Sequence, residues 1–256
     1  MTAELRLLGV GVRLAGRPVV QDVTVTLRPG RLVAIVGPNG AGKTSLLRAL
    51  VGLVPSTGRC TLGDIDLAAL TRRERARRLA YLPQGHEVHW PIPVRDIVAL
   101  GRYPHGAPDP DRLSEADRAA VASAMAVTET AAFADRPVTE LSGGERARVA
   151  LARVFAADAP VVLADEPTAA LDPRHQLDVM GALRGRARAG AIVVAVTHDL
   201  GLAARFADDA VVLRDGQLAA FGPPGEALAP AILKGVFGVE AYTATHGGMP
   251  VLVPWS

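Results

Sequence analysis

Residues 37–44, Gly-Pro-Asn-Gly-Ala-Gly-Lys-Thr, have the residue types and the spacing needed to bind a polyphosphate. They match the pattern G-x-x-x-x-G-K-[ST], in which glycines let backbone N–H groups turn toward an anion. Lys43 adds a compact positive charge, and Thr44 offers a hydroxyl to Mg²⁺. A helix that begins here would point the positive end of its dipole at the same anion. The stretch therefore predicts a nucleotide site, against the alternative of a glycine-rich turn with a chance lysine.

The segments on either side of this loop are those that the motif requires. Leu32–Val36 is a short apolar run suited to a buried parallel strand, and Ser45–Leu50 has apolar residues at helical spacing. Lys43 and Lys234 are the only lysines in a chain that otherwise uses arginine. A planar guanidinium cannot replace a point-like ammonium at this position. These observations favour a phosphate-binding loop over the chance turn.

Length and composition limit the classes of protein to consider. The 256 residues, 49% hydrophobic and 21% charged, suit one large globular domain or two small ones. No run of eighteen predominantly apolar residues occurs, and the N-terminus lacks the basic and apolar segments of a secretion signal. We therefore expect a cytosolic location. The single cysteine, Cys60, cannot form an internal disulfide, and a net charge of +2 is too small to indicate nucleic acid.

Short strands are predicted before and after the loop. Segments 5–8, 10–14 and 23–27, separated by turn residues, predict a small antiparallel β layer, and residues 59–62 resemble an edge strand. A capping box at Thr71 and Glu74 opens a helix that we expect to end near Leu79. The arginines from Arg72 to Arg78 favour a solvated helix face over a nucleic-acid surface, because no aromatic residues are interleaved to stack bases.

The rest of the chain alternates strands with helices. Apolar strands are predicted at 81–84, 161–166 and 191–196; each ends in polar residues, and helices such as 175–188 separate them. This order predicts a parallel sheet whose carboxyl edge carries the site. Residues 86–140 show mostly helix signals, including a helix at 114–127, and we treat them as a helical insertion. A hairpin is expected at 210–218, followed by a weakly structured C-terminus with a last strand at 251–253.

Two acidic residues and a second glycine-rich stretch narrow the chemistry. Asp165 ends an apolar strand, as does the acid that holds Mg²⁺ in phosphate-loop enzymes, and Glu166 beside it could polarise a water molecule. Ser142-Gly143-Gly144 at the start of a helix would form a second anion-binding nest. Two phosphate-binding elements in one chain require an explanation.

The stretch Leu141-Ser142-Gly143-Gly144-Glu145 is, letter for letter, the signature of the ATP-binding cassette (ABC) ATPases, and the resemblance covers nearly the whole chain. Gln84 resembles the Q-loop glutamine of that family, Ala170-Leu171-Asp172 its D-loop, and His198 its switch histidine. The resemblance implies an α/β fold. Its parts are a P-loop NTPase core with a mainly parallel sheet, an N-terminal antiparallel β layer and an inserted α-helical subdomain at about 86–140, all within a single ATPase domain spanning 1–256.

The resemblance also implies roles for individual residues. Lys43 and His198 would contact the γ-phosphate of ATP, Glu166 would act on the attacking water, and Gln84 would sense the phosphate. Thr44, Gln84 and Asp165 would belong to the Mg²⁺ shell. Two chains would stack head to tail, so that each signature closes over the nucleotide of the other chain. The residues expected to bind ATP are Leu14, Gly37, Pro38, Asn39, Gly40, Ala41, Gly42, Lys43, Thr44, Ser45, Ser142, Gly143, Gly144 and Asp172.

Some positions depart from the family pattern or stand outside it. Family members usually stack adenine on an aromatic residue of the β layer, but Leu14 stands at the matching position. The lost stacking would weaken binding by about 1 kcal/mol. Thr44-Ser45 reverses the common order and keeps the hydroxyl. The other histidines show no compact set of metal-ligand spacings and are interpreted as structural; they are His86, His89, His105, His175 and His246.

Two further stretches indicate a branch of the family. Residues 90–105 and Pro173-Arg174-His175-Gln176 resemble importers of iron-siderophore, haem and vitamin B12. This resemblance implies an ATPase that works as a homodimer under two transmembrane permease subunits, at the cytoplasmic face of the membrane. A substrate-binding protein would be an indirect partner, and no nucleic acid is expected. The alternatives are a soluble ATPase of the same fold that acts on ribosomes or DNA, and the ATPase of an exporter.

Overall fold

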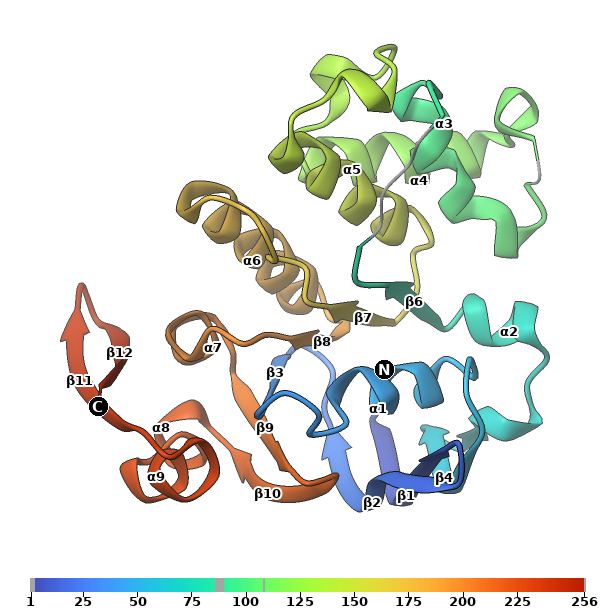
Figure 1. Ribbon diagram of the computed structural model, residues 1–256. Helices are drawn as coiled ribbons and strands as arrows, with labels where there is room; N and C mark the ends of the chain where they lie inside the picture. The colour runs from blue at the N-terminus through green and yellow to red at the C-terminus, as the bar shows by residue number, and fades with distance from the viewer. Residues whose placement is uncertain (1–2, 86–89, 108, 256) are drawn as a thin grey trace. The chain divides into compact units, whose positions relative to one another are not determined.

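The computed structural model describes residues 3–85, 90–107 and 109–255 (Figure 1). The chain forms two compact units, one made of Met1–Leu70 with Arg184–Ser256 and the other of Thr71–Leu183. The predicted insertion at 86–140 lies within the second unit, and its boundaries stay a prediction. His86 and His89 lie outside the described residues. In the part of the chain that the structure describes, no helix is both long and apolar enough to cross a membrane.

The antiparallel layer of the first unit has the strand order β2-β1-β4-β5. The predicted strands 5–8 and 10–14 are one strand, β1 (Leu5–Leu14), with a register shift after Leu8 and a left-handed Gly9. A tight turn at Ala15 and Gly16, both with positive φ, leads into β2 (Arg17–Leu27). The strand predicted at 59–62 is present, but it does not lie at the edge of the layer. β4 (Ser56–Leu62) lies between β1 and the two-residue β5 (Ile65–Asp66), which was too short to leave a sequence signal.

The parallel strands of the first unit support the phosphate loop. β3 (Leu32–Val36) is fully buried and pairs in parallel with β8 (Ile192–Val196) and β9 (Asp209–Arg214). β10 (Gln217–Gly222) pairs antiparallel with β9 and closes the predicted hairpin. Every residue of β3 and β8 is buried, which is typical of strands that have parallel neighbours and are covered on both faces.

The C-terminal region is more ordered than the sequence indicated. It contains α8 (Pro224–Ala227), α9 (Pro230–Phe237) and a hairpin of β11 (Glu240–His246) with β12 (Met249–Trp255). Prolines begin both helices, a left-handed Gly238 ends α9, and Gly247-Gly248 makes the hairpin turn. The expectation of a weakly structured end was therefore wrong.

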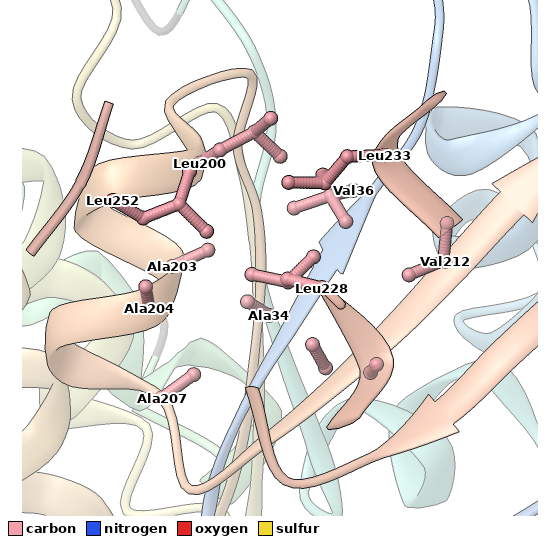
Figure 2. Packing of buried hydrophobic residues seen from close by; sticks show 12 residues of the cluster. Ala34, Val36, Leu200, Ala203, Ala204, Ala207, Val212, Leu228, Leu233 and Leu252 are labelled. Carbon is pink, nitrogen blue, oxygen red and sulfur yellow. The ribbon is translucent and has the colours of Figure 1, made fainter. Parts of the chain in front are cut away.

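Isolated apolar residues join this C-terminal region to the core. Leu233 is fully buried and Leu252 is 8% exposed, and both pack with β3 and with α7 (Leu200–Phe206) in the cluster of Figure 2. Burial of one leucine contributes about 2 kcal/mol to the free energy of unfolding. The last strand of the chain is thus part of the core beneath the phosphate loop.

The second unit is mainly helical. α3 (Val94–Ala99), α4 (Glu115–Val127) and α5 (Gly143–Ala156) pack against one another, as Figure 1 shows, and the 3-10 turn η2 (Leu100–His105) packs on α5. A nearly buried ion pair ties these elements together, since Arg102 Nε lies 2.7 Å from Asp117 Oδ1 and Nη1 donates to the carbonyl of Ala156. Further short 3-10 turns lie at Pro110–Arg112, Ala131–Phe133 and Val138–Glu140.

The remaining elements of the second unit are two parallel strands, with one helix that precedes them and one that follows them. α2 (Arg72–Ala76) begins with the predicted capping box at Thr71 and Glu74. It ends before Leu79, where we had expected it to extend, because β6 (Leu79–Leu82) starts there. β6 pairs in parallel with β7 (Val161–Asp165). α6 (Pro173–Arg188) follows β7 and begins two residues earlier than predicted.

Candidate nucleotide site

The phosphate loop runs from the end of β3 to the start of α1 (Lys43–Leu50). Its glycines are required by the surrounding backbone. A Cβ at Gly37 would lie 2.2 Å from the carbonyl oxygen of Leu213, and one at Gly42, which has φ 93°, would lie 2.5 Å from that of Val19. No side chain fits at such distances, so the loop takes this shape only with glycine there. Pro38, Asn39, Gly40 and Ala41 complete the loop, and Thr44 and Ser45 lie in the first turn of α1.

Lys43 is held inside the loop. Lys43 is 6% exposed, and its Nζ donates hydrogen bonds to the carbonyl oxygens of Gly37 at 2.8 Å and Pro38 at 2.9 Å. An ammonium in such a buried place is costly unless it is well bonded or paired with an anion. The loop therefore presents a fixed positive charge, beside the first N–H groups of α1, where a phosphate would be stabilised.

His198 belongs to the same edge of the first unit. β8 is in register with β3, Ile35 opposite Val196, and the N–H of Thr197 donates to the carbonyl of Ile35 at 3.1 Å. The carboxyl ends of neighbouring parallel strands meet at one edge, so the exposed His198 and the phosphate loop share it. Asp199 caps α7 by accepting from the N–H of Leu202 at 2.8 Å, which fixes the chain direction after the histidine. Leu14, in the antiparallel layer, is 39% exposed at the end of β1.

Two strand ends in the second unit bring Gln84 and Glu166 together. Leu82 of β6 lies opposite Ala164 of β7, so the two polar residues follow at equal distances along the chain. Gln84 Nε2 donates to Glu166 Oε2 at 2.7 Å. Glu166 has φ 50°, a conformation that costs a non-glycine residue about 1–2 kcal/mol. Such local strain clusters at functional sites.

Asp165 precedes Glu166 and is almost completely buried, at 1% exposed. The hydroxyl of Tyr81 donates to Asp165 Oδ2 at 3.1 Å, a partner that sequence reasoning missed. The only signal for it was a tyrosine in the strand before Gln84, and its meaning depends on the register between the two strands. A buried carboxylate supported in this way is held in one orientation.

The side chains present suit Mg²⁺ bound together with a nucleotide. No cluster of three or more His, Cys, Asp or Glu side chains that could hold a metal exists among the described residues. Mg²⁺ seldom needs such a cluster, because it keeps several waters and uses one or two protein oxygens plus substrate phosphates. The carboxylate of Asp165 in the second unit and the hydroxyl of Thr44 in the first unit are each an oxygen donor of that kind.

The signature segment begins α5 with a second capping box. Ser142 Oγ accepts from the N–H of Glu145 at 3.3 Å, and Glu145 Oε2 accepts from the N–H of Ser142 at 2.8 Å. The bond from the Ser142 backbone N–H, and after it a bond from the Ser142 side chain to the same carboxylate, lower the pKa of Glu145. The N–H of Ser142, which we expected to face an anion, is thus bonded to Glu145. Gly143 is exposed, and a Cβ added to it would meet no described atom within 4 Å.

Asp172 begins α6. Its Oδ1 accepts from the backbone N–H of His175 at 3.0 Å, and its Oδ2 lies 2.7 Å from His175 Nδ1. The two bonds, the backbone one first, lower the pKa of Asp172 below its usual value. The carboxylate is 59% exposed and stays available to other partners. Sequence reasoning treated His175 as structural and gave it no contact with Asp172.

Comparisons with known proteins indicate one family. The profile of the family described as ABC transporter matches residues 20–169. The hemin import ATP-binding protein HmuV of Streptomyces coelicolor is 48% identical over 249 residues, which cover 96% of this chain and 88% of that protein. The cobalamin import ATP-binding protein BtuD of Halobacterium salinarum is 43% identical over 244 residues, which cover 94% of this chain and 60% of that protein.

Solved structures extend the similarity to three dimensions. A chain of an ABC transporter of proposed metal-chelate type, in an inward-facing conformation, has a TM-score of 0.84 and 25% identity, covering 100% of this chain and 98% of that one. The similarity confirms the predicted fold class, with an antiparallel layer, mainly parallel strands and a helical segment. With a phosphate loop, a signature segment and this similarity along nearly its whole length, the chain belongs to the ABC transporter family as an ATP-binding ATPase subunit.

Proposed function

We propose that the chain is the ATPase subunit of an importer that carries haem or a related metal chelate. The observation that carries the ATPase part is Lys43, buried and hydrogen-bonded inside a loop whose shape only glycines allow. The cargo is supported by relatives that are named for hemin and cobalamin import. The resemblance at 90–105 and 173–176 points to the same class.

The roles proposed for the polar residues are those that the family resemblance implies. Lys43 and His198 contact the γ-phosphate, and Glu166 accepts the proton of the attacking water while Gln84 holds its carboxylate. Thr44, Gln84 and Asp165 would hold Mg²⁺, which would supply positive charge to offset the negative charge of the nucleotide phosphates. Leu14 offers apolar contact to the base.

A head-to-tail homodimer is proposed to complete each site. Gly143 supports it, because nothing in the described chain explains why this position lacks a side chain. Its backbone is outside the left-handed region, so the first position of α5 does not require glycine for its backbone conformation. The requirement then comes from outside the chain, where Ser142, Gly143 and Gly144 close over the nucleotide of the partner, with Asp172 beside them.

Two permease subunits at the cytoplasmic face of the membrane are the proposed binding partners, with a substrate-binding protein as an indirect one. Nucleic acid is not a proposed partner. In the arginine-rich segment 72–78, Arg73 Nε and Arg77 Nε both donate to the carbonyl of Pro104, at 2.9 and 2.7 Å. Two of its guanidinium groups are therefore used to hold the chain in place.

Glu166→Gln tests the ATPase and the dimer together. We expect kcat to fall at least a hundredfold, because a general base is worth roughly 10²–10⁴ in rate, while ATP still binds and traps a dimer. Turnover by ATP assay and mass by light scattering measure the two effects. Adding Ser142→Arg should prevent the ATP-trapped dimer, since it puts bulk and charge in the signature. Undiminished turnover in Glu166→Gln would remove this residue from the base role.

Partner recovery tests the transport assignment. The tagged chain, with ATP and the Glu166→Gln change, is incubated with detergent-solubilised membranes of its own cell, with ribosomes and with DNA. Recovery of a permease, followed by ATP-dependent haem uptake into vesicles that contain both chains, supports the importer. Stable recovery of ribosomes or DNA in its place contradicts it.

A further inference from the structure

The ring of His175 lies against Gly144, the second glycine of the signature. A Cβ at Gly144 would stand 2.5 Å from Cδ2, 2.6 Å from Cγ and 2.7 Å from Nε2 of that ring. Real side chains do not approach so closely, so the imidazole occupies the space that any other residue at 144 would fill. Gly144 is buried, whereas the neighbouring Ser142 and Gly143 are exposed. The absence of a side chain at Gly144 therefore has an explanation within the chain, unlike that at Gly143.

The other side of the same ring is fixed by Asp172. His175 Nδ1 donates to Asp172 Oδ2 at 2.7 Å, and the backbone N–H of His175 donates to Oδ1 at 3.0 Å. The carboxylate is thus bound twice by one residue. Hydrogen bonds with an ionised partner are among the stronger ones in proteins, and the lowered pKa of Asp172 keeps the carboxylate ionised.

These two contacts make His175 the link between the signature and the D-loop. We propose that His175 is a positioning residue, which fixes the carboxylate of Asp172 relative to the first turn of α5 so that both segments meet the nucleotide as one rigid surface. The inference rests on the proposed function for its consequence in catalysis. The contacts themselves lie within the second unit of one chain and need no nucleotide.

Imidazole combines two properties that other side chains offer only separately. It is flat enough to lie on a glycine, and it carries an N–H at the position that reaches the carboxylate. Phenylalanine keeps the ring without the N–H, and asparagine keeps an N–H near the position of Nδ1 without the full ring. A side chain at 144 would force the ring to rotate and so break its bond to Asp172. His105, whose Nε2 donates to the carbonyl of Ala157 at 2.9 Å, makes no comparable link between two nucleotide-facing segments.

The contact itself is tested by a double-mutant cycle on the ATP-free chain. Gly144→Ala should lower the Tm by about 3 °C, since overpacking of this kind costs about 1 kcal/mol or more. In the His175→Ala background the same change should lower the Tm by less than about 1 °C, because the space is then open. An equal loss in both backgrounds would overturn the contact between Gly144 and His175.

The positioning role is tested by steady-state kinetics of the complete protein. We expect His175→Phe to lower kcat about tenfold with KM for ATP within about twofold of wild type, because ATP is held by the phosphate loop while the closed site is misaligned. His175→Asn should recover at least half of the fall in log kcat that His175→Phe causes. His246→Phe, a matched change on the exposed β11, should leave kcat unchanged.

Each outcome bears on a separate statement. If His175→Phe and His175→Asn are both as active as wild type, the positioning role is wrong even if the Tm cycle shows coupling. If the two variants lose activity equally, the bond to Asp172 is not what matters, and the proposal also fails. A wild-type chain without ATPase activity, even with its permease partners, would overturn the proposed function, while the Tm cycle would still decide the contact.

Discussion

The phosphate loop and the signature segment both precede a helix and both contain glycines, yet the reasons for the glycines differ. At Gly37 and Gly42 the chain's own carbonyl groups would collide with a side chain. At Gly143 nothing in the described chain would. Contacts within the chain therefore require glycine in the phosphate loop, whereas the space beside Gly143 is not filled by any described atom of the chain.

This difference explains how the two segments can serve one reaction. The phosphate loop holds its lysine in place by bonds to the carbonyls of Gly37 and Pro38 without any ligand. The signature segment is also ordered, through its capping box and His175, but Ser142 and Gly143 stay exposed, as the proposed contact with a partner requires. A glycine without a structural reason is therefore a more direct indication of an external contact than a glycine in a strained turn.

Gly37→Ala should have the largest effect, because the added methyl group would meet the carbonyl of Leu213. We expect the free energy of unfolding to fall by about 3 kcal/mol or more, and ATP binding to be lost with the shape of the loop. Urea unfolding and titration with a fluorescent ATP analogue measure both. Gly185→Ala is the matched control on the exposed face of α6, where a Cβ meets nothing and stability should rise by about 0.5–1 kcal/mol. Normal stability of Gly37→Ala would remove the distinction between the two segments.

Gly143→Ala should separate stability from activity. Its Tm should match that of the wild type, because the Cβ points into open space. The rate of ATP hydrolysis should fall about tenfold or more, since a misplaced anion-binding N–H is costly in a closed site. ATP-dependent dimerisation in the Glu166→Gln background should weaken in parallel. Full activity would mean that no partner approaches Gly143.

Glu145→Gln should have the smallest effect and should depend on pH. The bonds to Ser142 hold the pKa of Glu145 below its usual value, so the charge of Glu145 stabilises the fold above that usual value. This contribution is lost as the pH falls through the lowered pKa. We expect the variant to lose less than about 1 kcal/mol at pH 7 and to equal the wild type once the pH is low enough to protonate Glu145. Urea unfolding at a series of pH values measures the difference in stability between the variant and the wild type. Glu115→Gln, in the first turn of α4, is the control. A difference that does not change with pH would mean that the charge of Glu145 is not its cause.

Local patterns predicted most of the elements that carry the site. The strands leading to Gly37, Asp165 and His198 are short apolar runs ending in polar residues, and each is found within a residue or two of its expected bounds. Motifs of fixed spacing placed the phosphate loop and the signature. These features depend on residues that are adjacent in the sequence, so the sequence alone shows them.

Features that depend on distant contacts were not predictable in the same way. Tyr81 reaches Asp165 only through the register of two strands, and His175 reaches Gly144 only when the first turn of α6 lies against the first turn of α5. The C-terminal hairpin is anchored by Leu252, a single buried leucine among prolines and glycines, which gives almost no periodic signal. Local patterns cannot establish the roles proposed for the site residues either, because those roles depend on a nucleotide and on the proposed second chain.

The pairing of β3 has a consequence for how the protein folds during its synthesis. β3 comes from residues 32–36, but its parallel neighbours come from residues 192–196 and 209–214, and the cluster around it is completed by Leu252. During synthesis the apolar strand that carries the phosphate loop emerges long before anything can cover it. Contacts so distant in sequence form slowly and leave apolar segments exposed to aggregation. The phosphate loop is therefore made well before the strands that pair with β3, and β3 stays uncovered until those strands have emerged.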